Sequence, residues 1–195
     1  MLIPTHMRMS EIIYSNIEKN TDFLLNRLTF KTGNMSPDIP LYHKHLKHYK
    51  HQNFDYILQM ISELSSVDPT VSMAEMNMYS YRLGVIAHYV CDYFCLPHHD
   101  RDTYQDNLKK HLVYEKDLHK AVKQYSHTDA VEFNSGLSLK SHELVHFFDE
   151  LLQKYLNEEV SFENDLQFAI SAASMVCSAI VMSSLSINTA ELAYA

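Results

Sequence analysis

The sequence predicts an all-α protein with a single domain spanning residues 1–195, and three observations support this fold class. Glycine and proline are scarce, at 3 and 5 residues in 195, whereas a turn-rich β fold uses many of both. Hydrophobic residues make up 46% of the chain, which is enough for a substantial core at this length. Apolar residues recur at helical spacing, without a convincing alternating strand pattern or internal repeat. We therefore expect roughly six to eight helices.

The first two helices are expected at Ile12–Leu28 and Phe54–Leu64, where apolar side chains recur every three or four residues. Between them, the segment from Lys31 to about Leu46 lacks this regular pattern. We expect a long irregular loop there.

The third helix, Tyr81–Leu96, is apolar around most of its circumference and should be buried. It carries His88 and Asp92, and a lone buried carboxylate is costly unless it has a partner or a cation. Pro97 follows directly and should bend or end the helix, which would redirect the side chain of His98.

The fourth and fifth helices are expected at Leu108–Val122 and Leu144–Leu156. A second loop should separate them at Ser126–Leu137, where Asn134-Ser135-Gly136 is a turn signal. The fifth helix has His142 and His146 at i,i+4 spacing, which we interpret as a half-exposed helix face without an assigned function.

The last helix, expected at Leu166–Leu185, largely overlaps a stretch without charge from Phe168 to Ala190. This stretch contains six serines, and small residues suit a tightly packed core helix, whereas a membrane span is richer in Leu, Ile and Phe. We therefore predict a core helix and no transmembrane segment.

The three cysteines, Cys91, Cys95 and Cys177, form no CxxC motif and are expected to be buried free thiols. Polar residues follow Met1–Pro4 at once, so no signal peptide is visible and a cytoplasmic location is expected.

Pairs of His and carboxylate at i,i+4 spacing are frequent in this chain. With 13 His and 24 acidic residues, chance gives about 1.6 such pairs (13 × 24/195), and five are present. The spacing places both side chains on one helix face, yet most such pairs are ordinary surface contacts. His88/Asp92 differs because of its apolar setting, and His111/Glu115 lies on the next helix. Mixed imidazole and carboxylate ligands favour zinc over magnesium or calcium.

At these residues the sequence resembles the zinc-dependent phospholipase C family, whose fold is shared by fungal zinc-dependent single-strand nucleases. The resemblance covers roughly residues 3 to 120 and rests on motifs in the family's order. These motifs are Thr5-His6, Gly33-Asn34-Met35-Ser36-Pro37-Asp38-Ile39, Lys47-His48-Tyr49, His88-x3-Asp92-x5-His98 and His111-x2-Tyr114-Glu115. It implies a multi-helix bundle of the phospholipase C type.

The resemblance also implies a cluster of two to three Zn²⁺ ions. Asp38, His48 and His88 would hold one ion, and Asp92 would bridge it to a second ion held by His6. A third ion would be held by His98, His111 and Glu115. Asp38 is either a ligand alone or also the catalytic group that orients or deprotonates the attacking water.

Two features depart from the family pattern. Secreted relatives use the amino group and carbonyl of an N-terminal Trp as zinc ligands, and this chain has no Trp, so we hypothesise that the Met1 amine substitutes. Around His48 the histidines are crowded, and His45 or His51 could be the ligand instead.

The predicted function is a zinc-dependent phosphodiester hydrolase acting on a phospholipid headgroup or a small phosphodiester. The net charge of −8 disfavours duplex nucleic acid as a partner. Two alternatives are open: a non-catalytic metal-binding helical scaffold, and a single-strand nuclease of the same fold. The sequence does not indicate an oligomeric state.

Overall fold

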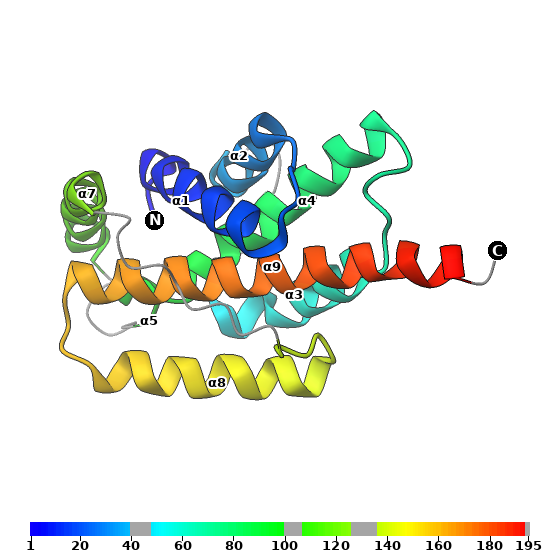
Figure 1. Ribbon diagram of the computed structural model, residues 1–195. Coiled ribbons are helices and arrows are strands. Elements are labelled where there is room, and N and C mark those ends of the chain that lie inside the picture. The colour runs from blue at the N-terminus through cyan, green and yellow to red at the C-terminus, as the bar shows by residue number, and fades with distance from the viewer. Residues whose placement is uncertain (40–47, 100–106, 126–135, 194–195) are drawn as a thin grey trace.

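The computed structural model describes residues 1–39, 48–99, 107–125 and 136–193, with side chains up to residue 186 (Figure 1). Within these residues all regular structure is helical and no strand occurs, so the prediction of an all-α fold is confirmed. The elements are α1 (Ile3–Thr21), α2 (Arg27–Met35), the 3-10 helix η1 (Ser36–Asp38), α3 (Lys50–Leu64), α4 (Met73–Asp92), α5 (Leu96–His99), α7 (Leu108–Gln124), α8 (Ser141–Asn157) and α9 (Phe162–Ala193).

Helix α9 is the longest element, and the other helices are arranged around it (Figure 1). It contacts α1 and α4 on one side and α3 and α8 on the other, and α7 lies near its beginning. Its segment Phe162–Ser186 is long and apolar enough to cross a membrane by length and composition, and 67% of its most apolar window is buried inside the protein. Asn16 and Asn20 on α1 donate hydrogen bonds to Ser174 and Ser178 of this helix, at 3.0 and 3.2 Å. Ser174 and Ser178 therefore pack against α1, as expected for a core helix.

Helices α2 and α4 cross in unusually close contact because each has a glycine at the crossing. A Cβ atom on Gly33 would overlap the carbonyl of Tyr81, and one on Gly84 would overlap the carbonyl of Phe30. Only glycine leaves room for this approach. The crossing brings the end of α2 and η1 beside the last two turns of α4, where the predicted metal ligands lie.

The prediction of one helix over Ile12–Leu28 is wrong. The chain forms α1 and α2 instead, because Asp22 adopts a left-handed conformation with φ of 51° and ends α1. Asn26 then starts α2, and its side chain accepts hydrogen bonds from the backbone N–H groups of Leu28 and Thr29. The irregular loop predicted from Lys31 is also partly wrong, since α2 and η1 continue to residue 38.

The third predicted helix is divided as well. Helix α4 ends at Asp92, five residues before Pro97, and Pro97 lies in the first turn of the short helix α5. Proline is favourable there because the first helical N–H groups need no partner within the helix. The predicted loop at Ser126–Leu137 falls mostly outside the described residues. The three cysteines are buried free thiols, as predicted.

Candidate metal centre

The side chain of Asp92, the last residue of α4, lies at the centre of the predicted site and is fully buried. Its Oδ1 atom is 2.8 Å from the amino group of Met1 and 3.2 Å from Nε2 of His6. Its Oδ2 atom is 2.7 Å from Nδ1 of His48 and 3.3 Å from Nε2 of His88. Burial alone would raise the pKa of Asp92, but these neighbours, the Met1 amine first, hold it well below its usual range.

Three groups of side chains that could hold a metal ion surround this carboxylate. In each group, one ligand atom per residue lies within 4.8 Å of the others. The groups are Asp38–His48–His88, His6–His88–Asp92 and His98–His111–Glu115.

The first group takes Asp38 from η1, His48 from the segment before α3, and His88 from α4. Asp38 Oδ1 lies 3.7 Å from His48 Nε2 and 3.8 Å from His88 Nε2. His88 Nδ1 lies 2.8 Å from the carbonyl oxygen of Asn34, which can only accept, so Nδ1 carries the hydrogen. The lone pair of Nε2 therefore points toward the group, which is how a backbone carbonyl orients a metal-binding imidazole.

The second group is the most buried. His6, His88 and Asp92 are all fully buried, and the imidazole rings of His6 and His88 stack with 3.8 Å between centroids. Burial, and then the neighbouring His88, lower the pKa of His6 well below its ordinary value. His6 is therefore neutral, and a neutral imidazole is the form that binds zinc.

The third group lies between α5 and α7. Glu115 Oε1 is 2.9 Å from His111 Nε2 and 3.5 Å from His98 Nε2. The carbonyl of His48 lies 3.2 Å from His98 Nδ1 and orients this ring as Asn34 orients His88. Burial opposes ionisation of Glu115, but contacts with His111 and His98 hold its pKa below the usual range.

The amino group of Met1 connects the second and third groups. It lies 2.8 Å from Asp92 Oδ1, 3.1 Å from Glu115 Oε1 and 3.2 Å from His98 Nε2. Burial would lower its pKa, but the two carboxylates outweigh burial and raise it. This ammonium therefore supplies positive charge at a position where the carboxylates favour a cation.

The residues fit zinc for two reasons. The donors are imidazole nitrogens and carboxylate oxygens, the mixture that zinc binds. In addition, Asp38 Oδ2 and His6 Nδ1 are buried polar atoms without a hydrogen-bond partner in the described part of the chain. Unpartnered buried polar atoms are costly and indicate an absent water or ion.

All eight ligands predicted from the sequence lie in the described residues and converge on Asp92. They are His6, Asp38, His48, His88, Asp92, His98, His111 and Glu115. Of the alternatives to His48, His51 is exposed on α3 outside the three groups, and His45 falls outside the described residues. On α8, His142 and His146 are exposed and belong to none of the groups. The assignment of ions to these side chains stays a prediction.

Sequence reasoning missed Asp165, which lies behind the third group in the first turn of α9. It accepts hydrogen bonds from Tyr155 Oη at 2.7 Å, Tyr114 Oη at 3.0 Å and the backbone N–H of Leu96 at 3.2 Å. Tyr114 precedes Glu115, and Leu96 lies in the turn that carries His98, so Asp165 fixes both elements that supply this group. Its only signal in the sequence is that it is the last acidic residue before the uncharged stretch.

Sequence reasoning also missed Tyr89, whose ring contacts those of His48 and His88 with centroids 5.6 and 5.1 Å apart. Its hydroxyl is buried and has no hydrogen-bond partner among the described residues. The only signal for Tyr89 in the sequence was its place directly after His88 on the same predicted helix.

The family model for zinc dependent phospholipase C matches residues 5–162. This span includes all eight predicted ligands. No curated protein and no solved structure matches the chain.

Proposed function

We propose that this chain, which belongs to the zinc-dependent phospholipase C family, is a phosphodiester hydrolase acting on a phospholipid headgroup or a small phosphodiester. The observation that carries the proposal is the convergence of three groups of zinc-type ligands on one buried carboxylate, Asp92. A site that served only to stabilise the fold would need one closed set of four ligands, whereas three adjacent groups suit several ions acting together.

The family and the ligand groups support zinc as the cofactor. Asp38, His48 and His88 would hold one ion, His6 and Asp92 a second, and His98, His111 and Glu115 a third. When bound, zinc lowers the pKa of water and offsets negative charge on phosphoryl oxygens. The Met1 amine, once it has lost its proton, would be a further nitrogen ligand between Asp92 and Glu115.

Asp38 is the candidate for moving a proton. Its Oδ1 atom faces His48 and His88, whereas Oδ2 has no partner among the described residues and remains available to orient or deprotonate water. Burial raises the pKa of this carboxyl, although His88 opposes the shift, and a raised pKa makes a carboxylate a better base. Asp38 would then serve both as ligand and as base.

The test begins with metal content and proceeds to turnover. Protein purified without chelator should contain about two to three zinc ions per chain, as expected for clustered catalytic ions. It should hydrolyse bis(p-nitrophenyl) phosphate, and chelator, His88→Ala or Asp92→Asn should abolish this activity. His146→Ala, an exposed histidine outside the site, is the matched control and should leave the rate unchanged. Equal residual rates in all samples would contradict the enzyme.

A non-catalytic scaffold is the second candidate function, and the Met1 ammonium favours it. This group pairs with Asp92 and Glu115, so the chain itself supplies a partner for the buried carboxylates. A protein that retains its fold and takes up no zinc when zinc is added back would support this alternative.

A further inference from the structure

The outer face of α7 combines exposed aliphatic side chains with lysines. Leu108, Leu112 and Val113 are exposed by 70%, 48% and 52% of their surface, although apolar residues of this size are usually buried. Leu118 and Val122 on the same helix are fully buried. Val113 lies on the face opposite to them, and Leu108 and Leu112 lie beside this packing face at the start of the helix.

The same face carries an excess of positive charge. Five exposed lysines lie on α7: Lys109, Lys110, Lys116, Lys120 and Lys123. Its two carboxylates are Glu115, which is buried in the metal centre, and Asp117, which pairs with Lys120 at 2.7 Å. Helix α7 thus has a formal charge of +3 (five basic minus two acidic residues), and the rest of the chain has −11, because the total is −8.

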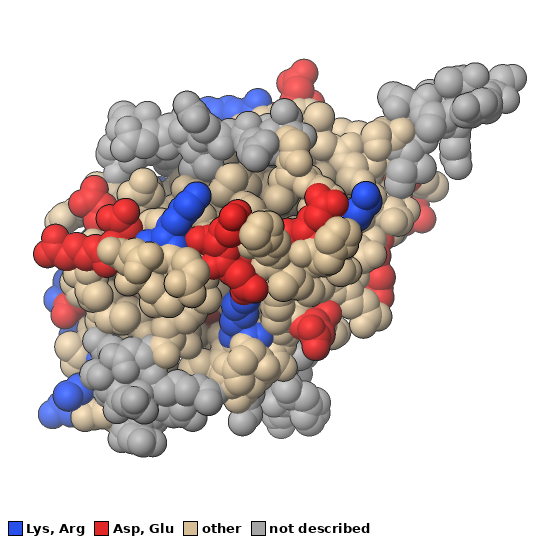
Figure 2. All heavy atoms as spheres, turned by 90° about the horizontal axis from the view of Figure 1, so that it is seen from below, with Lys and Arg blue, Asp and Glu red and all other residues tan. Residues whose placement is uncertain are grey.

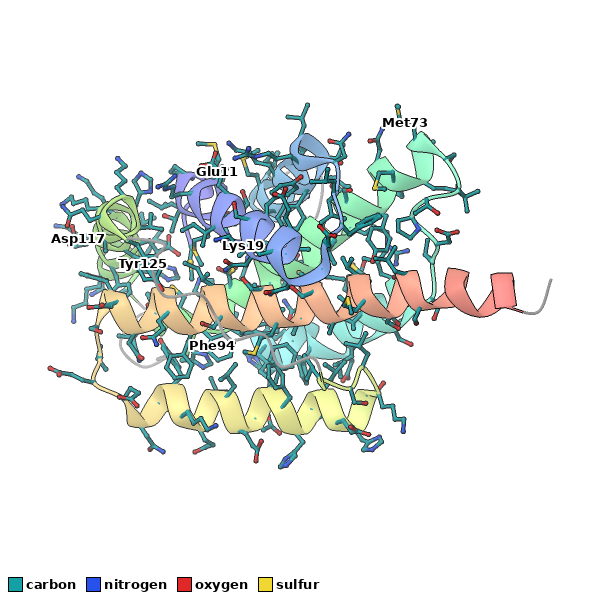
Figure 3. All side chains as sticks on the ribbon, in the orientation of Figure 1. Glu11, Lys19, Met73, Phe94, Asp117 and Tyr125 are labelled. Carbon is teal, nitrogen blue, oxygen red and sulfur yellow. The ribbon has the colours of Figure 1, made fainter. Side chains whose placement is uncertain are left out.

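This charge is confined to one end of the molecule. Figure 3 shows α7 at that end, where Asp117 is labelled. By contrast, Figure 2 shows the α8 side, where acidic side chains form a broken row across the surface. On α8, Glu143 and Asp149 each pair with a lysine, at 3.8 and 2.7 Å, and the side chain of Glu150 is exposed by 61%. An anionic surface would therefore be attracted by α7 more strongly than by α8.

Two shallow hollows lie on the α7 face. One of about 480 Å³ is lined by Leu108, Lys109, Leu112, Val113 and Lys116. A second, of about 330 Å³, lies between α7 and the beginning of α9, where Phe162 contacts the ring of Tyr114. The lining atoms of both are chiefly apolar.

The α7 face adjoins the candidate metal centre. His111 and Glu115 are on the same helix, and Leu112 directly follows His111 in the chain. The side chain of His111 is 18% exposed, more than His98 at 6% or Glu115 at 8%. A surface bound to the α7 face would therefore lie beside a partly exposed ligand of the centre; His48 of the first group, at 25%, is another.

We propose that the α7 face docks onto an anionic phospholipid bilayer, with Leu108, Leu112 and Val113 entering the headgroup region and the lysines contacting lipid phosphates. Protein interfaces are depleted in lysine and enriched in aromatic residues and arginine, whereas this face is rich in lysine and has no Arg, and Tyr114 and Phe162 at its edge are half-buried. Single-stranded nucleic acid needs aromatic rings for stacking. Helices that lie in a membrane interface combine apolar residues, which enter the headgroup region, with lysines that are attracted to anionic lipids.

The inference rests on the proposed function in one respect: the docked bilayer would also supply the substrate. Binding is tested separately, by co-sedimentation of the zinc-loaded full chain with phosphatidylcholine vesicles, with and without phosphatidylserine, at times too short for hydrolysis. Binding should be stronger with phosphatidylserine and should weaken with salt. The double variants Leu112→Ser/Val113→Ser and Lys109→Glu/Lys116→Glu should each lose roughly tenfold or more in vesicle affinity. Leu156→Ser/Val160→Ser, equally exposed residues elsewhere, is the control and should bind like the original protein.

Hydrolysis of bis(p-nitrophenyl) phosphate, which needs no membrane, should be unchanged in both α7 variants. Suppose that neither the original protein nor any variant cleaves this substrate, but the α7 substitutions weaken vesicle binding. The proposed function is then contradicted, and the docking surface is supported. Vesicle binding that is absent, or equal in all variants, would overturn the docking surface. Self-association of the protein would also overturn the docking surface if the α7 substitutions abolished it, because the face would then be a protein interface. Light scattering without vesicles detects such self-association.

Discussion

The second and third ligand groups of the metal centre differ in how the protein holds them. His6, His88 and Asp92 lie on α1 and α4, two helices packed in the core, and all three are fully buried. The third group lies on the four-residue helix α5 and on α7 at the end of the molecule, with His111 partly exposed. The second group is fixed by the packing of core helices, whereas the third is supported by the hydrogen bonds that Asp165 accepts from α5 and α7.

This difference suits the two groups to different tasks, the binding of an ion and the approach of a substrate. Buried ligands on core helices are preorganised, which lowers the cost of binding an ion. A more open group allows a substrate to approach, and loops and element ends near a rigid scaffold commonly have this role. We therefore expect substitutions in the second group to affect folding and metal binding together, and substitutions in the third group to affect metal binding with less effect on folding.

Replacing Asp92 should have the largest effect on stability. In Asp92→Ala the buried ammonium of Met1 loses its nearest partner, and His6, His48 and His88 lose theirs. Breaking a buried ion pair on one side costs about 3 to 5 kcal/mol. Urea unfolding with chelator present should show this loss, and Asp117→Ala on the surface of α7 should show little change. A loss under 1 kcal/mol would mean that the buried charges are not coupled as the structure indicates.

Asp165 tests whether the third group depends on a buried support. Burial raises its pKa from 3.8 to about 6, against the opposing hydrogen bonds from Tyr155, Leu96 and Tyr114. Between these two pKa values the folded protein keeps the proton on Asp165, whereas the unfolded chain has lost it. The contribution of this protonation to the free energy of unfolding is therefore full below pH 3.8 and is lost as the pH rises through about 6. The full difference corresponds to about 3 kcal/mol.

Asp165→Asn cannot ionise and should remove this dependence. The free energy of unfolding of the original protein minus that of the variant should fall by about 2 kcal/mol between pH 4 and 7, since part of the full difference lies below pH 4. Urea titrations at several pH values measure it, with Glu150→Gln on exposed α8 as the control. A difference that does not change with pH would show that Asp165 is ionised throughout.

The sequence was sufficient for those parts of the site that depend on one helix. His88/Asp92 and His111/Glu115 are pairs at i,i+4 spacing, and the apolar setting of the first pair distinguished it from a surface contact. The convergence of both pairs was implied by the family resemblance and not by spacing. Periodicity fixes a helix face and does not fix where that face points in the folded chain.

Contacts that depend on tertiary packing could not be predicted. The carbonyl of Asn34 orients His88 only because α2 and α4 cross at Gly33 and Gly84. Asp165 reaches Leu96 and Tyr114 across 69 and 51 residues of sequence. The division at Asp22 was missed because a left-handed helix end is usually marked by glycine, and aspartate adopts it less often.

Glu115 provides the direct contrast with Asp92. Glu115→Gln keeps the shape of the side chain but removes the charge that His111 and His98 contact. We expect the loss of about one zinc ion, the one for which Glu115 is a ligand. The free energy of unfolding should fall by only about 1 to 3 kcal/mol, since the group is less enclosed. Elemental analysis and urea unfolding of the same preparation measure both quantities. Loss of all zinc would show that the groups bind cooperatively and are not separable in this way.

The smallest effect on zinc binding is expected from extending the chain before Met1, which tests the link between the two groups. A Gly-Ser extension converts the ammonium into an uncharged amide, so Asp92 and Glu115 lose a cation at 2.8 and 3.1 Å and a bound ion loses a nitrogen donor. The core ligands on α1 and α4 are unchanged, so the number of zinc ions should stay the same at saturating zinc. The affinity for the weakest ion should fall roughly tenfold, similar to the loss of an outer partner of a metal ligand. Competition titration with a zinc chelator measures this affinity. Unchanged affinity in the extended chain would exclude the Met1 amine as a ligand and leave the third group to His98, His111 and Glu115 alone.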